Sequence, residues 1–103
     1  MSGPRPRLRS FNIRPPQYRE IIEDAAVTTV IDAEGAIHQR LEEAYDALKW
    51  KLTRDAECGY LLDEKHWVYK QQGSQRHKVP GLIALYIIDD FQVTLLSIQV
   101  CVY

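Results

Sequence analysis

The chain has 103 residues, of which 46% are hydrophobic and 26% are charged, and its formal net charge is −1 at pH 7. This length and composition predict one globular domain whose core needs no disulfide or metal support. They exclude a protein with membrane-spanning helices, because Asp89 and Asp90 interrupt the longest apolar run well before the roughly 18 residues that such a helix needs.

Residues 1–9 are rich in Pro, Gly and Arg and lack the apolar stretch of a signal peptide. We expect them to form a flexible basic leader of a cytoplasmic protein, followed by a single domain over residues 10–103. Residues 10–14 alternate polar and apolar side chains, which predicts a short strand ended by Pro15 and Pro16.

A first helix is predicted to begin near Pro16, because proline suits the first turn of a helix. Residues 27–31 are all β-branched, so the pattern does not fix the residue at which this helix ends. The apolar positions that follow helical spacing are Ile21, Ile22, Ala25, Ala26, Thr29 and Val30.

A second helix has the clearest periodic pattern of the chain. Asp32 can cap a helix that starts near Ala33, whereas a start at Ala36 keeps Gly35 out of the helix. The Cys-Gly pair at residues 58–59 ends the helical pattern. The apolar stripe consists of Ile37, Leu41, Ala44, Tyr45, Leu48 and Leu52.

Three consecutive strands are predicted over residues 58–71, 79–89 and 92–103. Residues 82–88 are apolar on both faces, which places the middle strand at the centre of a sheet. We therefore expect an α+β fold, in which a short N-terminal strand and a two-helix hairpin precede a three-stranded antiparallel meander. The first strand can pair at an edge of the meander or beside its last strand.

Two amphipathic helices can bury their stripes only against one face of this sheet. The opposite face is then left partly open, and it is concave because sheets twist. We expect this uncovered face to be the binding surface, and we expect the exposed strand edges to favour association with a partner.

Charge is distributed unevenly along the chain. Residues 1–16 hold four Arg and no acidic residue, residues 17–46 hold eight acidic residues against two basic ones, and residues 47–78 hold seven basic residues against four acidic ones. The pattern predicts one acidic and one basic surface, and a basic surface is typical of nucleic-acid binding. Acidic helix faces also occur without any partner.

One candidate interface combines basic residues with Trp67 and Tyr69, as single-stranded RNA binding requires. Strand alternation places these two rings on one face and His66, Val68 and Lys70 on the other, so a solvated hairpin with buried rings is the alternative. The basic residues are Lys65, His66, Lys70, Arg76, His77 and Lys78.

Further cations, Lys49, Lys51 and Arg54, lie near the end of the second predicted helix, where the helix dipole stabilises them even without a ligand. Trp50 is off the apolar stripe and indicates either a partner surface or packing at the boundary of the core. The four Arg of residues 1–16 are consistent with a phosphate-binding arm or a solubilising tail.

Metal and disulfide chemistry find little support in the sequence. His38, His66 and His77 have no ligand partners at metal-binding spacing, so we expect no metal and no other cofactor. Cys58 and Cys101 are expected to be reduced, half-buried thiols, although a disulfide between strands stays open.

The sequence contains neither a Gly-x-Ser-x-Gly element nor a Gly-rich phosphate loop after a strand. If the protein is an enzyme, general acid–base cleavage of RNA fits its side chains best. The available groups are His66, Lys70, Arg76, His77 and Tyr86.

Three segments resemble the strands of the RelE/ParE toxin superfamily: Val-Tyr-Lys at 68–70, Ala-Leu-Tyr-Ile-Ile-Asp-Asp at 84–90 and Val-Thr-Leu-Leu-Ser-Ile at 93–98. In that family a short first strand and two helices precede them, so the resemblance covers about residues 10–100. Most of these residues form the core, which makes the resemblance specific for the fold.

The resemblance implies the toxin of a bacterial type II toxin–antitoxin system that is neutralised by a cognate antitoxin. One branch of the family cleaves messenger RNA on the ribosome, and another inhibits DNA gyrase. The ribonuclease branch usually carries an Arg on the strand before the Leu-x-Tyr element, but residues 82–85 contain none.

We therefore expect Lys70, Arg76 and the terminal Tyr103 to be the candidate catalytic residues. The alternative is a non-toxic, dimerising interaction module of the same fold. Residues expected to bind nucleic acid or another target are Lys49, Lys51, Arg54, Lys65, His66, His77 and Lys78.

Overall fold

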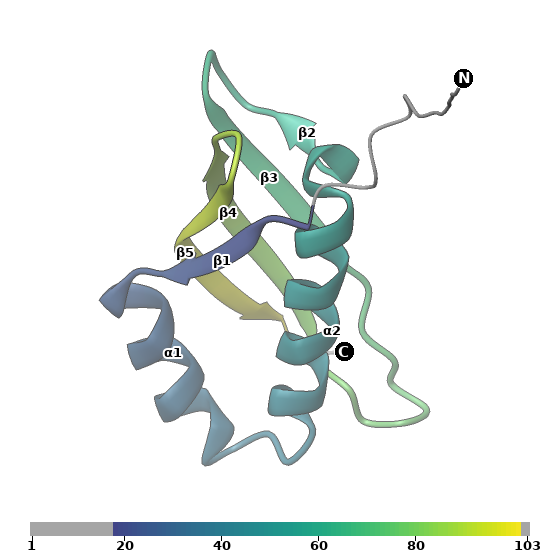
Figure 1. The fold of residues 1–103 in the computed structure, drawn as a ribbon. Coiled ribbons are helices and arrows are strands. Elements are labelled where there is room, and N and C mark those ends of the chain that lie inside the picture. The colour runs from purple at the N-terminus through teal and green to yellow at the C-terminus, as the bar shows by residue number, and fades with distance from the viewer. Residues whose placement is uncertain (1–17, 102–103) are drawn as a thin grey trace, which may run out of the picture.

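The computed structural model describes residues 18–101, which form two α-helices and a five-stranded mixed sheet (Figure 1). The expected leader and the strand predicted at residues 10–14 lie outside this range. The order of strands across the sheet is β1-β5-β4-β3-β2, with β1 parallel to β5 and the other neighbours antiparallel. The α+β class is thus as expected, but the sheet is larger than predicted.

The first strand, β1 (Glu20–Glu23), occupies a segment that we predicted to be helical. Its backbone pairs with β5 from Glu20 opposite Gln92 to Glu23 opposite Leu95. Adjacent β-branched residues at 21 and 22 suit an extended backbone, and pairing with a distant strand decides the conformation. The prediction of a helix starting near Pro16 was therefore wrong for residues 20–23.

Helix α1 (Ala25–Gly35) starts directly after β1, because the Asp24 side chain caps it by accepting a 2.9 Å hydrogen bond from the Ala26 N–H. Val27 and Ile31 are its buried residues. The helix ends at Gly35, a residue that we did not expect in the interior of a helix.

Helix α2 (Leu41–Arg54) contains most of the predicted apolar stripe, but it begins later than expected. Ile37 lies in the connection between the helices and is 70% exposed, so its assignment to the buried stripe was wrong. The buried positions of α2 are Leu41, Ala44, Tyr45, Leu48 and Leu52.

The segment predicted as one strand over residues 58–71 contains two strands. A 3-10 turn, η1 (Ala56–Cys58), leads to β2 (Tyr60–Leu61), and a turn then leads to β3 (His66–Gln71). The turn is stabilised by Asp63, whose carboxylate accepts hydrogen bonds from two backbone N–H groups. The side-chain cap thus interrupts the extended chain.

The remaining strands are β4 (Gly81–Ile88) and β5 (Gln92–Cys101). Strand β4 pairs with β3 on one side and β5 on the other, as its apolar composition predicted. The register shifts between Leu85 and Tyr86, which pair with Ser97 and Leu95, so that Leu96 is an extra residue in β5.

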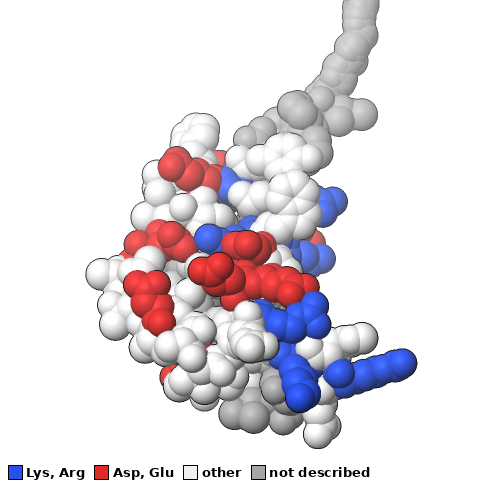
Figure 2. All heavy atoms as spheres, turned by 90° about the horizontal axis from the view of Figure 1, so that it is seen from below, with Lys and Arg blue, Asp and Glu red and all other residues white. Residues whose placement is uncertain are grey.

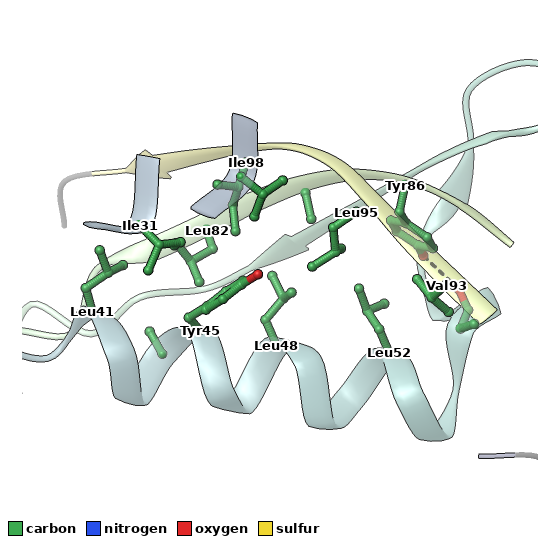
Figure 3. Packing of buried hydrophobic residues seen from close by; sticks show 14 residues of the cluster. Ile31, Leu41, Tyr45, Leu48, Leu52, Leu82, Tyr86, Val93, Leu95 and Ile98 are labelled. Carbon is green, nitrogen blue, oxygen red and sulfur yellow. Dashed lines mark hydrogen bonds between the residues drawn. The ribbon is translucent and has the colours of Figure 1, made fainter. Parts of the chain in front are cut away.

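Both helices cover the same face of the sheet, and the core lies between them and the strands (Figures 1 and 3). In Figure 3, side chains of α2 point toward Leu82, Tyr86 and Leu95 of the sheet. No helix within residues 18–101 has both the length and the apolar character that crossing a bilayer requires.

Candidate nucleic-acid interface

Lys70 lies near the end of β3, on the sheet face that the helices do not cover. Its neighbours face the other way: Tyr69 packs against the core, and the Gln71 side chain donates a 2.7 Å hydrogen bond to the Ala44 carbonyl of α2. Strand alternation therefore turns the exposed Lys70 side chain toward the uncovered face. The predicted separation of Lys70 from Trp67 and Tyr69 is confirmed.

Trp67 also faces the helices, where its ring stacks on Tyr86 with a centroid distance of 6.5 Å. Neither Trp67 nor Tyr69 is then presented beside the cations of β3. The predicted stacking of unpaired bases at this strand is not supported by the positions of these rings.

A hollow of about 500 Å³ lies beside Lys70, where β3, β4 and the end of β5 meet the loop that connects β3 to β4. Three glutamines are among its lining residues, and Lys70 is the only charged residue among those described. The lining consists of Lys70, Gln71, Gln72, Gly73, Gln75, Gly81, Leu82, Ile83 and Cys101.

The β3–β4 loop (residues 72–80) is folded into a tight tip. Backbone hydrogen bonds of 2.8 and 2.9 Å join Ser74 to Val79, and the Ser74 hydroxyl accepts a bond from the His77 N–H. Lys78 adopts a positive φ of 59°, a conformation that closes tight turns. This folding places Arg76 at the exposed end of the loop.

Arg40 connects this loop to the start of α2. One of its terminal nitrogens donates a 2.9 Å hydrogen bond to the His77 carbonyl, while its other nitrogens bind both carboxylate oxygens of Glu43 at 2.9 and 2.7 Å. The guanidinium of Arg40 lowers the pKa of Glu43 by hydrogen bonding. The loop is therefore attached to the helical layer through one side chain.

A second hollow, of about 350 Å³, lies where the loop approaches the connection between the helices. His77 and Lys78 line this hollow together with Arg40, whereas Gln75 lines the hollow beside Lys70. The loop thus separates the predicted residues, with Lys70 on one side, His77 and Lys78 on the other, and Arg76 between them.

The predicted cations of α2 have different surroundings. Lys49 lies 3.3 Å from a carboxylate oxygen of Glu23 and 4.5 Å from the centre of the Tyr45 ring, so it is engaged within the fold. Lys51 and Arg54 are exposed, and the Arg54 guanidinium lies 5.2 Å from the centre of the Trp50 ring.

Lys65 and His66 lie at the opposite end of β3 from Lys70. The imidazole Nδ1 of His66 is 2.9 Å from the Asp63 carboxylate. Backbone hydrogen bonds from Lys65 and His66, together with this side-chain contact, lower the pKa of Asp63 to about 2. The structure therefore does not bring Lys65 and His66 together with Arg76.

Tyr86 is fully buried, and its hydroxyl donates to the Ala56 carbonyl, so it is not placed to act on a bound molecule. Tyr103 lies outside the described residues.

Cys58 and Cys101 are free thiols, and burial raises the pKa of Cys58. In the part of the chain that is described, no three His, Cys, Asp or Glu side chains are grouped to hold a metal ion.

The sequence interpretation overlooked two features of this region. The glutamine side chains that line the hollow were not selected, although the run Gln-Gln-Gly-Ser-Gln at residues 71–75 is visible in the sequence. Arg40 was also missed, because its hydrogen-bond partner lies 37 residues away.

Charged side chains are unevenly distributed on one face of the molecule. Figure 2 views the end at which α1 and α2 are connected and shows Asp and Glu across the middle of this face, with Lys and Arg toward one side. The β3–β4 loop lies on that side, at the lower right in Figure 1. Comparisons with protein-family models, curated proteins and solved structures find no significant match.

Proposed function

We propose that this protein is a RelE/ParE-like toxin of a bacterial type II toxin–antitoxin pair, and that it inhibits growth by acting on messenger RNA. The resemblance of residues 68–70, 84–90 and 93–98 supports the family, and so does the placement of two helices on one face of the sheet. The observation that carries the proposal is the basic end of the uncovered face, where Lys70 adjoins the Arg76-bearing loop.

Cleavage of RNA by its own 2′-hydroxyl needs a group that accepts a proton, a group that protonates the leaving 5′-oxygen, and cations that stabilise the negative charge on phosphorus. Lys70 and Arg76 supply positive charge on the accessible side of this region. The His77 imidazole belongs to the same loop but lines the hollow on the side away from Lys70, so the terminal Tyr103, which lies outside the described residues, is the remaining proposed proton-transfer group.

A protein partner is supported by the opposite end of the sheet. Tyr60 and Leu61, which form the edge strand β2, are exposed together with the following Leu62. Apolar side chains on an edge strand favour pairing with another chain. The cognate antitoxin is the expected partner, and the same edge would serve a non-toxic interaction module.

Expression in a bacterial host tests the proposal. The wild-type chain should arrest growth and produce cleaved messenger RNA, and a small protein encoded beside it should relieve the arrest. The double variant Lys70→Ala, Arg76→Ala should abolish both effects. Lys65→Ala serves as a control, because it removes an exposed cation from the far end of β3.

The outcomes separate the alternatives. Arrest that persists in the double variant with intact messenger RNA would contradict RNA cleavage, and loss of DNA supercoiling in those cells would assign the target to gyrase. Normal growth at high expression of the wild-type chain would support the interaction module instead.

A further inference from the structure

An exposed aromatic surface lies over the last turns of α2 and the chain that enters β1. Trp50 is 60% exposed and Tyr18 is 64% exposed. Two exposed cations, Lys51 and Arg54, belong to the same turns of the helix. These four residues are called the Trp50 surface below.

The burial pattern of α2 explains why Trp50 points outward. Leu48 and Leu52 are fully buried against the sheet, and a residue two positions from each lies on the opposite side of a helix with 3.6 residues per turn. Arg54 follows Trp50 by one turn, and its guanidinium packs near the indole ring. The contact leaves most of the ring open to solvent.

Backbone contacts place Tyr18 near this part of the helix. The Arg19 N–H donates a 3.0 Å hydrogen bond to the Thr53 carbonyl, and the Thr53 hydroxyl donates to the Arg19 carbonyl. Tyr18, which precedes Arg19, therefore lies beside the last turn of α2. Both exposed rings thus lie near the last turns of α2, Trp50 on the helix itself and Tyr18 in the chain that precedes β1.

The cations of the Trp50 surface differ from the other cations on or next to α2. Arg40, which precedes the helix, is paired with Glu43, and Lys49 is paired with Glu23. Among residues 18–101, Lys51 and Arg54 make no ion pair, although Asp55 and Glu57 follow them in the chain. Positive charge beside exposed rings is thus available to an anionic partner.

We propose that the Trp50 surface binds single-stranded RNA, with an unpaired base stacked on Trp50 and neighbouring phosphates near Lys51 and Arg54. Flat rings beside cations bind single strands because every base has a π-face and every nucleotide a negative charge. The inference deepens the proposed action on RNA and rests on it for its biological role, but it does not require RNA cleavage. It assigns the stacking function to Trp50 rather than to Trp67, whose ring faces the helices.

Tryptophan fluorescence of the full chain provides a direct test. Trp67 is stacked on Tyr86 inside the fold, so a change on binding reports mainly on Trp50. Adding an RNA oligonucleotide of about eight uridines should quench the emission, since such sites cover roughly 4–16 nucleotides. Trp50→Ala should weaken binding, measured by anisotropy of a labelled oligonucleotide, by about tenfold.

Phe91→Ala is the matched control, because Phe91 is 76% exposed but lies in the turn between β4 and β5. It should bind RNA like the wild type. Lys51→Ala and Arg54→Ala should each reduce the slope of binding affinity against salt by about one. Far-ultraviolet circular dichroism confirms that each variant is folded.

Several outcomes would overturn the inference: a wild-type chain that does not bind the oligonucleotide, or a Trp50→Ala variant that binds it equally well. Equal RNA binding with lost neutralisation by the antitoxin would assign the surface to a protein partner. If growth is not arrested but binding depends on Trp50, the toxin proposal fails and the Trp50 surface stands. If the double variant Lys70→Ala, Arg76→Ala abolishes toxicity while Trp50→Ala binds RNA normally, the toxin proposal stands and the Trp50 surface fails.

Discussion

The hydroxyl of Tyr86, in the middle of β4, donates a 2.7 Å hydrogen bond to the carbonyl oxygen of Ala56, just after α2. Both residues are buried, and burial raises the pKa of the Tyr86 phenol, which keeps the donor protonated. A Cβ added at Gly59 would approach the same hydroxyl to 2.7 Å and the Val68 carbonyl oxygen to 2.3 Å. The centre of the sheet and the end of the helical layer therefore meet at a contact without spare space.

Tyr86→Phe should lower the free energy of unfolding by about 1–2 kcal/mol, because it leaves the Ala56 carbonyl buried without this donor. Tyr45→Phe is the matched control, since it also removes a phenol hydroxyl. Water can replace that hydroxyl at the partly exposed Glu23 carboxylate, so the loss should be smaller. Urea denaturation measures both variants, and equal losses would contradict the importance of burial at Ala56.

Asp63, in the turn between β2 and β3, should make the stability of the fold depend on pH in the acidic range. Folding lowers the pKa of Asp63 from 3.8 to about 2, chiefly through hydrogen bonds from backbone N–H groups. The stabilisation is complete above pH 3.8 and is lost as the pH falls toward 2, because the carboxylate must then accept a proton.

Asp63→Asn should therefore lose less stability than the wild type between pH 4 and pH 2, as measured by thermal unfolding at each pH. Glu64→Gln, at the adjacent exposed position, controls for the removal of one negative charge. A variant Asp63→Asn with the same pH profile as the wild type would contradict the proposed linkage.

Elements with a regular hydrophobic periodicity could be predicted from the sequence alone. The stripe from Leu41 to Leu52 and the apolar run of β4 each contain several residues with one period, so the buried face follows directly. Strand β1 has only four residues, and its conformation depends on pairing with β5, about seventy positions away. Local patterns carry no information about such a partner.

The same difference between local patterns and long-range contacts applies to the candidate site. Alternation along β3 correctly separated Lys70 from the aromatic rings, because alternation is a local property of a strand. The hollow beside Lys70 could not be predicted, since it combines β3, the β3–β4 loop and Cys101 at the end of β5. The attachment of the loop through Arg40 likewise depends on tertiary structure.

The close approach at Gly73 yields a prediction for the loop. A Cβ at this position would lie 2.5 Å from the Gly81 nitrogen and 2.6 Å from the Val79 carbonyl oxygen, both of which are backbone atoms that cannot swing aside. Gly73→Ala should therefore reduce the free energy of unfolding by about 1–3 kcal/mol.

Gly35→Ala is the matched control, because nothing lies within 4 Å of the added Cβ at the end of α1. It should leave stability unchanged or raise it by up to about 0.5 kcal/mol through better helix propensity. Chemical denaturation compares the two variants. A Gly73→Ala chain as stable as the wild type would show that the loop adapts.

The attachment of the β3–β4 loop to α2 can be tested by hydrogen exchange. Arg40→Ala removes the side chain that donates to the His77 carbonyl, so the loop should open more often. Exchange of the Ser74 and Val79 amides, which bond across the tip, should accelerate by about fivefold. The amides of β4 should be unaffected, since they belong to the sheet.

Glu43→Gln separates the two contacts of Arg40, because it removes the ion pair and leaves the guanidinium free to reach the loop. Its exchange rates should lie between those of the wild type and Arg40→Ala. If Arg40→Ala leaves the Ser74 and Val79 rates unchanged, the hydrogen bond does not hold the loop. If it accelerates them, the conformation of the loop that bears Arg76 depends on Arg40, a residue at the start of α2 that lies outside the proposed Lys70 and Arg76 site.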